Sequence, residues 1–331
     1  MAIYRCNKCG RLEELAATEV GAARACPACG HTNTVYDTVF FTRKLLERYF
    51  VLQTAMKRLQ AETEEREAEP GSDVAAVDLQ RIDLHNTDQI ATDLQHGPIH
   101  DWFRAKQIQV RADLKAVDTT GFFDEVAVEI GQNYELHKSL IDQIRYAQTR
   151  NHTGLNVALA KRSQREQQQI TAFCRMLYDY SFVSKYFYQK NEKVIRMGLQ
   201  ASARVRDFFA GEWLEWFALM QVLQTAQKSG GRSSCARSLK VVFQNEDVHE
   251  LDVFALLGGT VSLCIECKTG EFRPFIDKYD SLRRRLGLNR KQFVVCVAGL
   301  ADEQASGLGA MYDLTFVNEA GLARHIETLL A

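Results

Sequence analysis

Two apolar segments in the last third of the 331-residue chain carry charged residues at matching positions. The first runs from Glu250 to Leu257 and contains Asp252, and the second runs from Val261 to Lys268 and contains Glu266. Charged side chains are rarely buried in strands unless they pair with an opposite charge or bind a metal ion. The two segments therefore predict adjacent strands whose acids share a metal site.

The register of these strands depends on the turn Gly258-Gly259-Thr260. A two-residue turn would send Asp252 and Glu266 to opposite faces, because side chains alternate along a strand. A three-residue loop pairs Asp252 with Glu266 and Glu250 with Lys268, and such loops commonly place a glycine in the left-handed region. In either register Glu266 and Lys268 share a face, about 7 Å apart, because they are two residues apart on one strand. We predict the three-residue loop, because only this register brings both carboxylates within reach of one ion.

A further acid is expected upstream, on an apolar helix that runs from Gly211 to about Lys228. Glu212 and Glu215 are spaced three residues apart and therefore share one face of that helix. The tryptophans beside them supply a stripe that can pack on a sheet. We predict that Glu215 projects into the same cleft as Asp252.

These motifs resemble the PD-(D/E)xK, or restriction-endonuclease-like, nuclease superfamily. Gly-x-Trp-Leu-Glu from residue 211, Glu-Leu-Asp-Val from residue 250 and Ile-Glu-Cys-Lys-Thr-Gly from residue 265 are most similar to the nuclease domain of the CARF-fused effector nucleases of type III CRISPR systems. The resemblance covers about residues 207–331 and implies an α/β (α+β) fold with a mixed central sheet. It includes a helix over 276–286, strands over 292–298 and 314–317, and a final helix. Before residue 207, no alternation of strands and helices suggests a CARF domain, so regulation by cyclic oligoadenylate is not expected.

The resemblance also implies roles for individual residues. Asp252 and Glu266 would bind Mg²⁺ or Mn²⁺, which prefer hard oxygen ligands, and the carbonyl of Cys267 would complete the shell. Lys268 would orient the attacking water and offset charge on the phosphate, while Glu215 would finish the site or hold a second ion. Auxiliary roles are open to Glu212 and Glu250. In the alternative interpretation, Glu266 and Lys268 form an ordinary ion pair and Asp252 caps a turn.

A second motif lies at the other end of the chain. Cys6-x-x-Cys9 and Cys26-x-x-Cys29 are separated by sixteen residues, and a glycine follows each pair. This spacing is typical of a zinc ribbon, in which four thiolates leave no open coordination position, so the zinc would be structural. Basic residues on the ribbon could bind nucleic acid, or they could be solvated charges on a ribbon that docks protein; these residues are Arg5, Lys8, Arg11, Arg24 and His31.

The remaining sequence suggests three domains: the ribbon over 1–38, an all-α domain over 39–205, and the nuclease domain over 206–331. Near-heptad apolar residues from Phe40 to about Glu69 favour packing within the domain, and alternatively could pair with a partner or a second copy, which would make a homodimer. An aromatic-rich stretch beside Lys185 and Lys190 could stack bases or pack in a core; it consists of Tyr178, Tyr180, Phe182, Tyr186, Phe187 and Tyr188.

A net charge of −1 excludes a generally basic surface, so contact with nucleic acid would need a local patch. The strongest patch for gripping phosphates follows the Glu-x-Lys strand, with a solvated helix end as the equal alternative; it consists of Arg283, Arg284, Arg285, Arg290 and Lys291. Scattered cysteines beside a zinc ribbon suit a reducing cytoplasm, and neither a signal segment nor an eighteen-residue apolar run is present. We therefore expect a cytoplasmic protein that does not interact with membranes.

Taken together, the sequence predicts a metal-dependent endonuclease that cuts DNA, or alternatively RNA, as a bacterial defence or genome-maintenance effector. The competing hypothesis is a non-catalytic zinc-ribbon adaptor that binds nucleic acid or protein through a degenerate nuclease fold. Intact acids at 252 and 266 and the lysine at 268 favour the enzyme.

Overall fold

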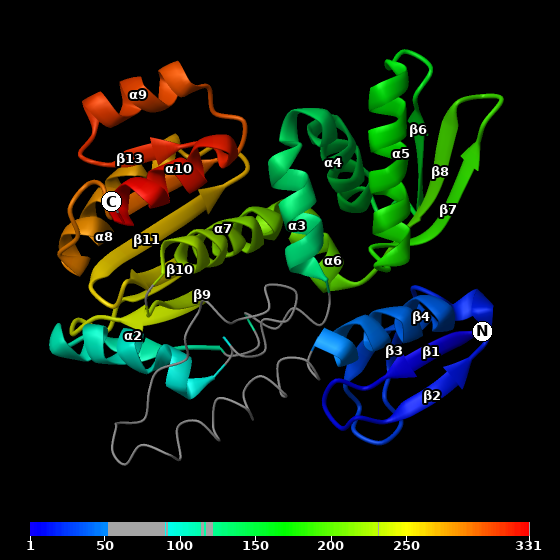
Figure 1. Cartoon of the computed structure of the whole chain (residues 1–331), viewed down its shortest axis with the longest axis horizontal. Helices are drawn as coiled ribbons and strands as arrows, with labels where there is room; N and C mark the ends of the chain where they lie inside the picture. The colour runs from blue at the N-terminus through cyan, green and yellow to red at the C-terminus, as the bar shows by residue number, and fades with distance from the viewer. Residues whose placement is uncertain (52–89, 91, 114–115, 117–121, 231, 331) are drawn as a thin grey trace. The chain divides into compact units, whose positions relative to one another are not determined.

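The computed structural model describes residues 1–51, 90, 92–113, 116, 122–230 and 232–330 (Figure 1). The chain forms two compact units. The first comprises residues 1–71 and 135–210, and the second comprises residues 72–134 and 211–331. The chain therefore passes between the units three times.

The first unit begins with a small four-stranded antiparallel sheet in the order β2-β1-β4-β3. Its elements are β1 (Ala2–Arg5), β2 (Leu12–Leu15), the 3-10 turn η1 (Ala17–Glu19), β3 (Ala23–Ala25) and β4 (Thr32–Asp37). Tyr4 and Val35 are buried between the strands together with two of the cysteines. Residues 38–51 are helical, and the rest of the helix expected to about residue 69 lies outside the described residues.

The first unit also contains a second antiparallel sheet, in the order β6-β8-β7. Its elements are α4 (Tyr134–Thr149), β6 (Gly154–Ala158), α5 (Gln164–Asp179), β7 (Val183–Gln189), β8 (Val194–Leu199) and α6 (Ala203–Asp207). The prediction that residues 39–205 are all-α is therefore wrong. The physical reason is visible in β7, where exposure alternates with a period of two from Ser184 to Tyr188, as in a strand with one covered face.

The second unit is built on a six-stranded sheet in the order β13-β12-β11-β10-β9-β5. The pairs from β5 to β11 are antiparallel, while β11, β12 and β13 are parallel, so the predicted mixed sheet is confirmed. The strands are β5 (Gln109–Arg111), β9 (Ser234–Val242), β10 (Val248–Leu257), β11 (Val261–Lys268), β12 (Phe293–Val297) and β13 (Thr315–Val317).

Helices surround this sheet (Figure 1). They are α2 (Asp93–Ala105), α3 (Phe123–Gln132), α7 (Trp213–Ser229), α8 (Ile276–Leu286), α9 (Asp302–Met311) and α10 (Glu319–Leu330), with the π-helical turn η5 (Phe208–Glu212) before α7 and the 3-10 turn η6 (Arg273–Phe275) before α8. The start of α7 is anchored by aromatic stacking, because Trp213 stacks on Tyr134 at 5.3 Å and Trp216 stacks on Phe123 at 5.9 Å. This packing fixes the helix that carries Glu215.

Part of the expected middle domain contributes to the second unit. Strand β5 forms one edge of the six-stranded sheet, α3 packs on α7, and α2 packs on β9. Phe103 of α2 lies 4.8 Å from Phe254 of β10, and both rings are buried. The division into 1–38, 39–205 and 206–331 stays a prediction, but the elements between residues 93 and 132 pack with the second unit.

The hairpin between β10 and β11 has the predicted register. Leu257 pairs with Val261, and the pairing continues without a shift to Val253 and Ile265. Gly258-Gly259-Thr260 is therefore a three-residue loop, and its two glycines have φ values of +57° and +75°. Glycine occupies this left-handed region at little cost, which explains why the loop can hold the odd register.

Candidate active site and zinc centre

Strands β10 and β11 bring three of the predicted site residues together. Counting back from the pair Val253–Ile265 places Asp252 opposite Glu266. At this point the backbone ladder ends, and the N–H of Cys267 donates to Asp252 Oδ2 at 2.7 Å. The Nζ atom of Lys268 lies 3.9 Å from the same oxygen. The hairpin register thus produces a cluster of two carboxylates and one ammonium group.

Glu266 is the most deeply buried member of this cluster, with 4% of its surface exposed. Among the described residues, none forms a hydrogen bond with its Oε1 atom. Burial and then the charge of Asp252 raise the pKa of Glu266 well above its usual value, while Lys268 and Lys278 act in the opposite direction. A carboxylate in this position is costly unless a cation or a proton neutralises it.

Asp252 and Lys268 shift each other's pKa. Burial raises the pKa of Asp252, and the charge of Lys268 and the Cys267 N–H counteract that rise. Burial acts to lower the pKa of Lys268, but Asp252, Tyr279 and Glu266 together raise it above its usual value. The lysine therefore stays protonated near neutral pH.

Helix α8 adds residues that the sequence interpretation missed. The Lys268 Nζ atom lies 6.0 Å from the ring centres of both Phe275, which immediately precedes α8, and Tyr279, which lies within it. The exposed Lys278 lies close enough to lower the pKa of both carboxylates. The signal that could have found them is their place on the first turn of the helix that follows the Glu-x-Lys strand.

Glu215 lies near the cluster, but its carboxylate is bound to a different partner. The guanidinium of Arg237 on β9 donates to Glu215 Oε2 at 2.9 Å and to the carbonyl of Ala116 at 2.7 Å. The same guanidinium lies 4.2 Å from the ring centre of Trp216. Burial and the charge of Asp252 raise the pKa of Glu215 to about 8, although Arg237 lowers it. Arg237 carried no sequence signal, because its contacts are all distant in the chain.

Asp252 and Glu266 are suited to bind a hard divalent cation, but Glu215 does not complete a three-ligand group with them. A buried, unpartnered Glu266 oxygen beside Asp252 is the chemistry that Mg²⁺ or Mn²⁺ would satisfy. However, among the described residues, Glu215 does not join them in a group of three ligand atoms within 4.8 Å of one another. The role of Glu215 as a further ligand therefore stays a prediction.

The three consecutive arginines of the predicted phosphate-binding patch form ion pairs within the protein. Arg283 is buried, with 8% of its surface exposed, and its Nη2 atom contacts Asp280 at 3.0 Å and Asp313 at 2.6 Å. Its Nη1 atom donates to the carbonyl of Leu288. Arg283 is therefore a structural residue of the α8 end, because its position on the helix faces the core. The prediction that Arg283 belongs to a surface patch is therefore wrong.

The other members of the patch are more accessible. Arg284 pairs with Asp280 at 2.6 Å, and Arg285 pairs with Asp247 at 3.1 Å. Arg290 and Lys291 are exposed in the turn between α8 and β12. Contact of these four residues with phosphates stays a prediction.

The four N-terminal cysteines converge as the spacing predicts. Their ligand atoms all lie within 4.8 Å of one another, with Cys6 Sγ 3.4 Å from Cys29 Sγ and Cys9 Sγ 3.6 Å from Cys26 Sγ. The N–H of the glycine after each pair donates to the carbonyl of the first cysteine of the pair at 2.8 Å, and both glycines have positive φ. Burial acts to raise the pKa of Cys6, but backbone N–H groups of the knuckle lower it to about 6. This donor set could hold zinc in a closed, structural site.

No described helix combines the length and apolar character needed to cross a lipid bilayer. No protein-family model matches the chain, and no curated protein matches it. The solved structures that are similar to this chain include the following two. One is Can2 from Sulfobacillus thermosulfidooxidans in complex with cyclic tetra-adenylate (cA4), at 12% identity and a TM-score of 0.49. The other is protein VC1899 from Vibrio cholerae, at 17% identity and a TM-score of 0.47. Each match covers 70% of this chain and only 60% of the other.

Proposed function

We propose that the second unit is a divalent-metal-dependent nuclease that hydrolyses phosphodiester bonds in DNA, with RNA as the alternative substrate. The observation that carries this proposal is the buried Glu266 carboxylate, whose Oε1 atom forms no hydrogen bond with any described residue, beside Asp252 and a protonated Lys268. A purely structural ion pair would leave no reason for a second buried acid at this position. A cation-binding site explains it.

In this proposal Asp252 and Glu266 hold Mg²⁺ or Mn²⁺, with the carbonyl of Cys267 as a further ligand. The bound metal would act as a Lewis acid on the scissile phosphate and lower the pKa of a water molecule. The Cys267 N–H fixes the orientation of Asp252 by donating to its Oδ2 atom at 2.7 Å. One carboxylate oxygen is thereby held in place before any ligand arrives.

Lys268 supplies positive charge at the site. Asp252 at 3.9 Å and the rings of Phe275 and Tyr279 at 6.0 Å surround its ammonium group. About a third of the side chain remains exposed, at 30%, so a phosphate oxygen could reach it. Lys268 would orient the attacking water and offset the charge that develops on the phosphate. Glu215, positioned by Arg237, would complete the site or bind a second ion.

The biological setting rests on the resemblance of the three motifs. This resemblance favours a defence effector that cuts foreign nucleic acid, or a genome-maintenance enzyme. All nine cysteines are free, which suits a reducing compartment such as the cytoplasm. A homodimer would allow two centres to cut both strands of a duplex.

The test is cleavage of plasmid, single-stranded DNA and RNA with Mg²⁺ or Mn²⁺. Asp252→Asn removes a ligand charge while keeping the shape, and Lys268→Ala removes the ammonium group. Glu303→Gln on α9 is the matched control, because it neutralises an exposed carboxylate elsewhere in the same unit. We expect each site variant to lose about 10²–10³-fold in cleavage rate, as when one preorganised electrostatic group is removed, and the control to keep the wild-type rate.

Two results would contradict the proposal. One is equal cleavage by wild type and both site variants, and the other is cleavage that does not depend on a divalent metal. A wild-type protein that binds nucleic acid tightly and cuts none of the substrates would instead favour the non-catalytic adaptor.

A further inference from the structure

The three-stranded sheet of the first unit has one covered face and one open face. Figure 1 shows α5 running along the sheet, and the covered face includes buried Val157, Ile195 and Met197. Tyr186 belongs to this face, where it lies 6.3 Å from Tyr178 of α5. The neighbouring Phe187 points the other way, because side chains alternate along β7, and 61% of its surface is exposed. The aromatic stretch thus divides between a core and a surface.

The open face carries an aromatic and a basic residue on the same cross-strand row. Phe187 of β7 pairs with Arg196 of β8, which in turn pairs with Asn156 of β6, and all three are exposed. The adjacent row of this face consists of Lys185, Gly198 and Gly154. Because 61% of the surface of Phe187 is exposed, a planar group could lie against its ring.

Local packing explains why position 198 is occupied by glycine. A Cβ atom at that position would lie 2.6 Å from Ser184 Oγ and 3.2 Å from Lys185 Cβ. The stem of Lys185 therefore lies close to the glycine, which helps to place its ammonium group on the open face.

Charge distinguishes this part of the chain from the rest. Residues 135–210 contain thirteen Lys and Arg residues against six Asp and Glu residues, whereas the whole chain is nearly balanced at 41 against 42. On the open face and its hairpin tip, Lys185, Lys190, Lys193 and Arg196 face a single acid, Glu192. The contact between Arg196 and Glu192 is 3.5 Å long and more than half exposed on both sides, so it holds the arginine only weakly.

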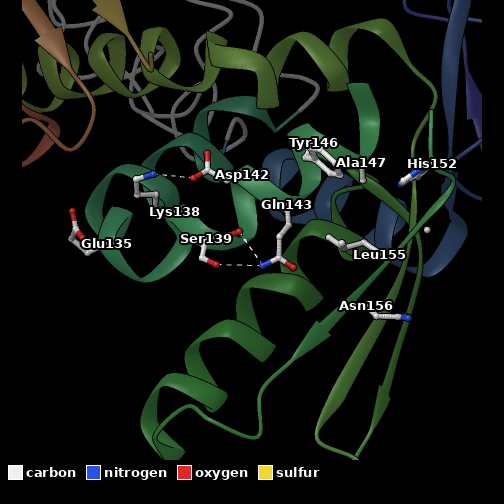
Figure 2. Close-up of a pocket in the computed structure, with 11 residues that line it drawn as sticks. Glu135, Lys138, Ser139, Asp142, Gln143, Tyr146, Ala147, His152, Leu155 and Asn156 are labelled. Atoms are coloured by element: carbon white, nitrogen blue, oxygen red, sulfur yellow. Dashed lines mark hydrogen bonds and ion pairs between the residues drawn. The ribbon is translucent and has the colours of Figure 1, made fainter. Parts of the chain in front are cut away.

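A groove lies between α4 and β6. Figure 2 shows its lining, which comes from α4, from His152 and from the residues Leu155 and Asn156 of β6. The groove has a volume of about 650 Å³ and contains Tyr146, whose side chain is 60% exposed. Its Asp142 is already neutralised by Lys138 at 2.8 Å and Arg145 at 3.0 Å. Asn156 belongs to both the groove and the open face.

We infer that this open face binds single-stranded nucleic acid, with one base stacked on Phe187 and flanking phosphates bound by Arg196 and Lys185. Exposed aromatic rings among basic residues are the combination that binds unpaired strands, because every base has a π-face and every nucleotide has a charge. In a duplex the bases are stacked on one another and cannot reach the ring. The inference goes beyond the proposed nuclease activity, since binding at this face does not require hydrolysis.

The experiment measures binding by fluorescence anisotropy with labelled dT20, rU20 and a 20-base-pair DNA duplex. The full chain carries Asp252→Asn and no divalent metal is added, so that cleavage cannot affect the result. Phe187→Ala tests stacking, Arg196→Ala tests phosphate contact, and Arg165→Ala is the matched control. Arg165 is an exposed arginine of the same unit, on α5 instead of the open face.

We expect Phe187→Ala to weaken binding of dT20 or rU20 by roughly 5- to 150-fold, the range for loss of one base–aromatic stack. The slope of log K against log salt should stay unchanged in that variant. Arg196→Ala should reduce this slope by about 0.7, the value for one phosphate contact on a single strand. Duplex binding should respond to Arg196→Ala but not to Phe187→Ala. The preference between dT20 and rU20 then distinguishes DNA from RNA.

Three outcomes would overturn the inference. The first is that the wild-type protein binds neither dT20 nor rU20. The second is that Phe187→Ala and Arg165→Ala lose the same amount of binding affinity. The third is a dimer in analytical ultracentrifugation that Phe187→Ala dissociates, since the face would then be an interface between two copies. Circular dichroism checks folding, and we expect each variant to be folded because the substituted side chains are exposed.

Discussion

Replacing Glu266 by Gln removes a buried charge without changing the shape of the side chain. In the metal-free protein, we expect Glu266→Gln to be more stable than wild type near neutral pH. Wild type must either keep an unpaired carboxylate in a buried position or take up a proton when it folds. Its Oε1 atom forms no hydrogen bond with the described residues, and burial raises its pKa well above the usual 4.5.

The magnitude follows from proton linkage. An acid whose pKa is raised on folding binds more protons in the folded state, so its folded form is favoured at low pH. Stability is then lost as the pH rises from the unfolded value of 4.5 towards the raised folded value. One such proton gives a slope of about 1.4 kcal/mol per pH unit. Between pH 5 and pH 7, wild type should therefore lose stability relative to Glu266→Gln, by up to about 2.7 kcal/mol if the folded acid keeps its proton over this whole range.

The assay is equilibrium unfolding followed by tryptophan fluorescence. All three tryptophans, Trp102, Trp213 and Trp216, lie in the second unit, so the signal reports the unit that contains Glu266. Adding Mn²⁺ at a hundred times its dissociation constant should stabilise wild type by about 2.7 kcal/mol, and Glu266→Gln much less. Parallel pH profiles of the two proteins, or equal stabilisation by Mn²⁺, would refute the reasoning.

Two further predictions concern the zinc centre and Arg237. Protein purified without chelator should contain one zinc per chain by mass spectrometry. The variants Cys9→Ala and Cys29→Ala should lose the zinc and become sensitive to proteolysis in the ribbon, because a four-thiolate site contributes directly to folding. Full zinc content in either variant would contradict this prediction. Arg237→Ala should destabilise the second unit by about 1–3 kcal/mol, since it removes the donors to the half-buried Glu215 and to the carbonyl of Ala116. Adding Glu215→Gln should restore part of that loss in the same fluorescence assay. Failure of the second substitution to restore stability would show that the cost lies in lost packing on Trp216.

Local chain geometry explains what the sequence could predict. The three-residue loop at Gly258-Gly259-Thr260 follows from the glycine content and from alternation along two apolar strands, and the structure confirms it. The convergence of Cys6, Cys9, Cys26 and Cys29 follows in the same way from spacing within two tight turns. Helix α8 also spans the expected residues, Ile276–Leu286.

Contacts between distant parts of the chain explain which features could not be predicted from the sequence. Arg283 seemed a surface residue because it sits in a run of three arginines, but Asp313, thirty residues on, binds it from a separate segment. Glu215 was expected to face a metal, and its partner Arg237 is 22 residues away. The hairpin of β7 and β8 was missed although its period-two pattern was present, because six closely spaced aromatic residues also suit an amphipathic helix.

The central claim is that Asp252 and Glu266 share one divalent cation beside Lys268. The most direct measurement is anomalous diffraction from crystals of the protein soaked in Mn²⁺. The account predicts an anomalous peak at coordination distance, about 2 Å, from a carboxylate oxygen of each acid, and this peak disappears in Asp252→Asn. Full occupancy elsewhere with no peak between these two carboxylates would contradict it.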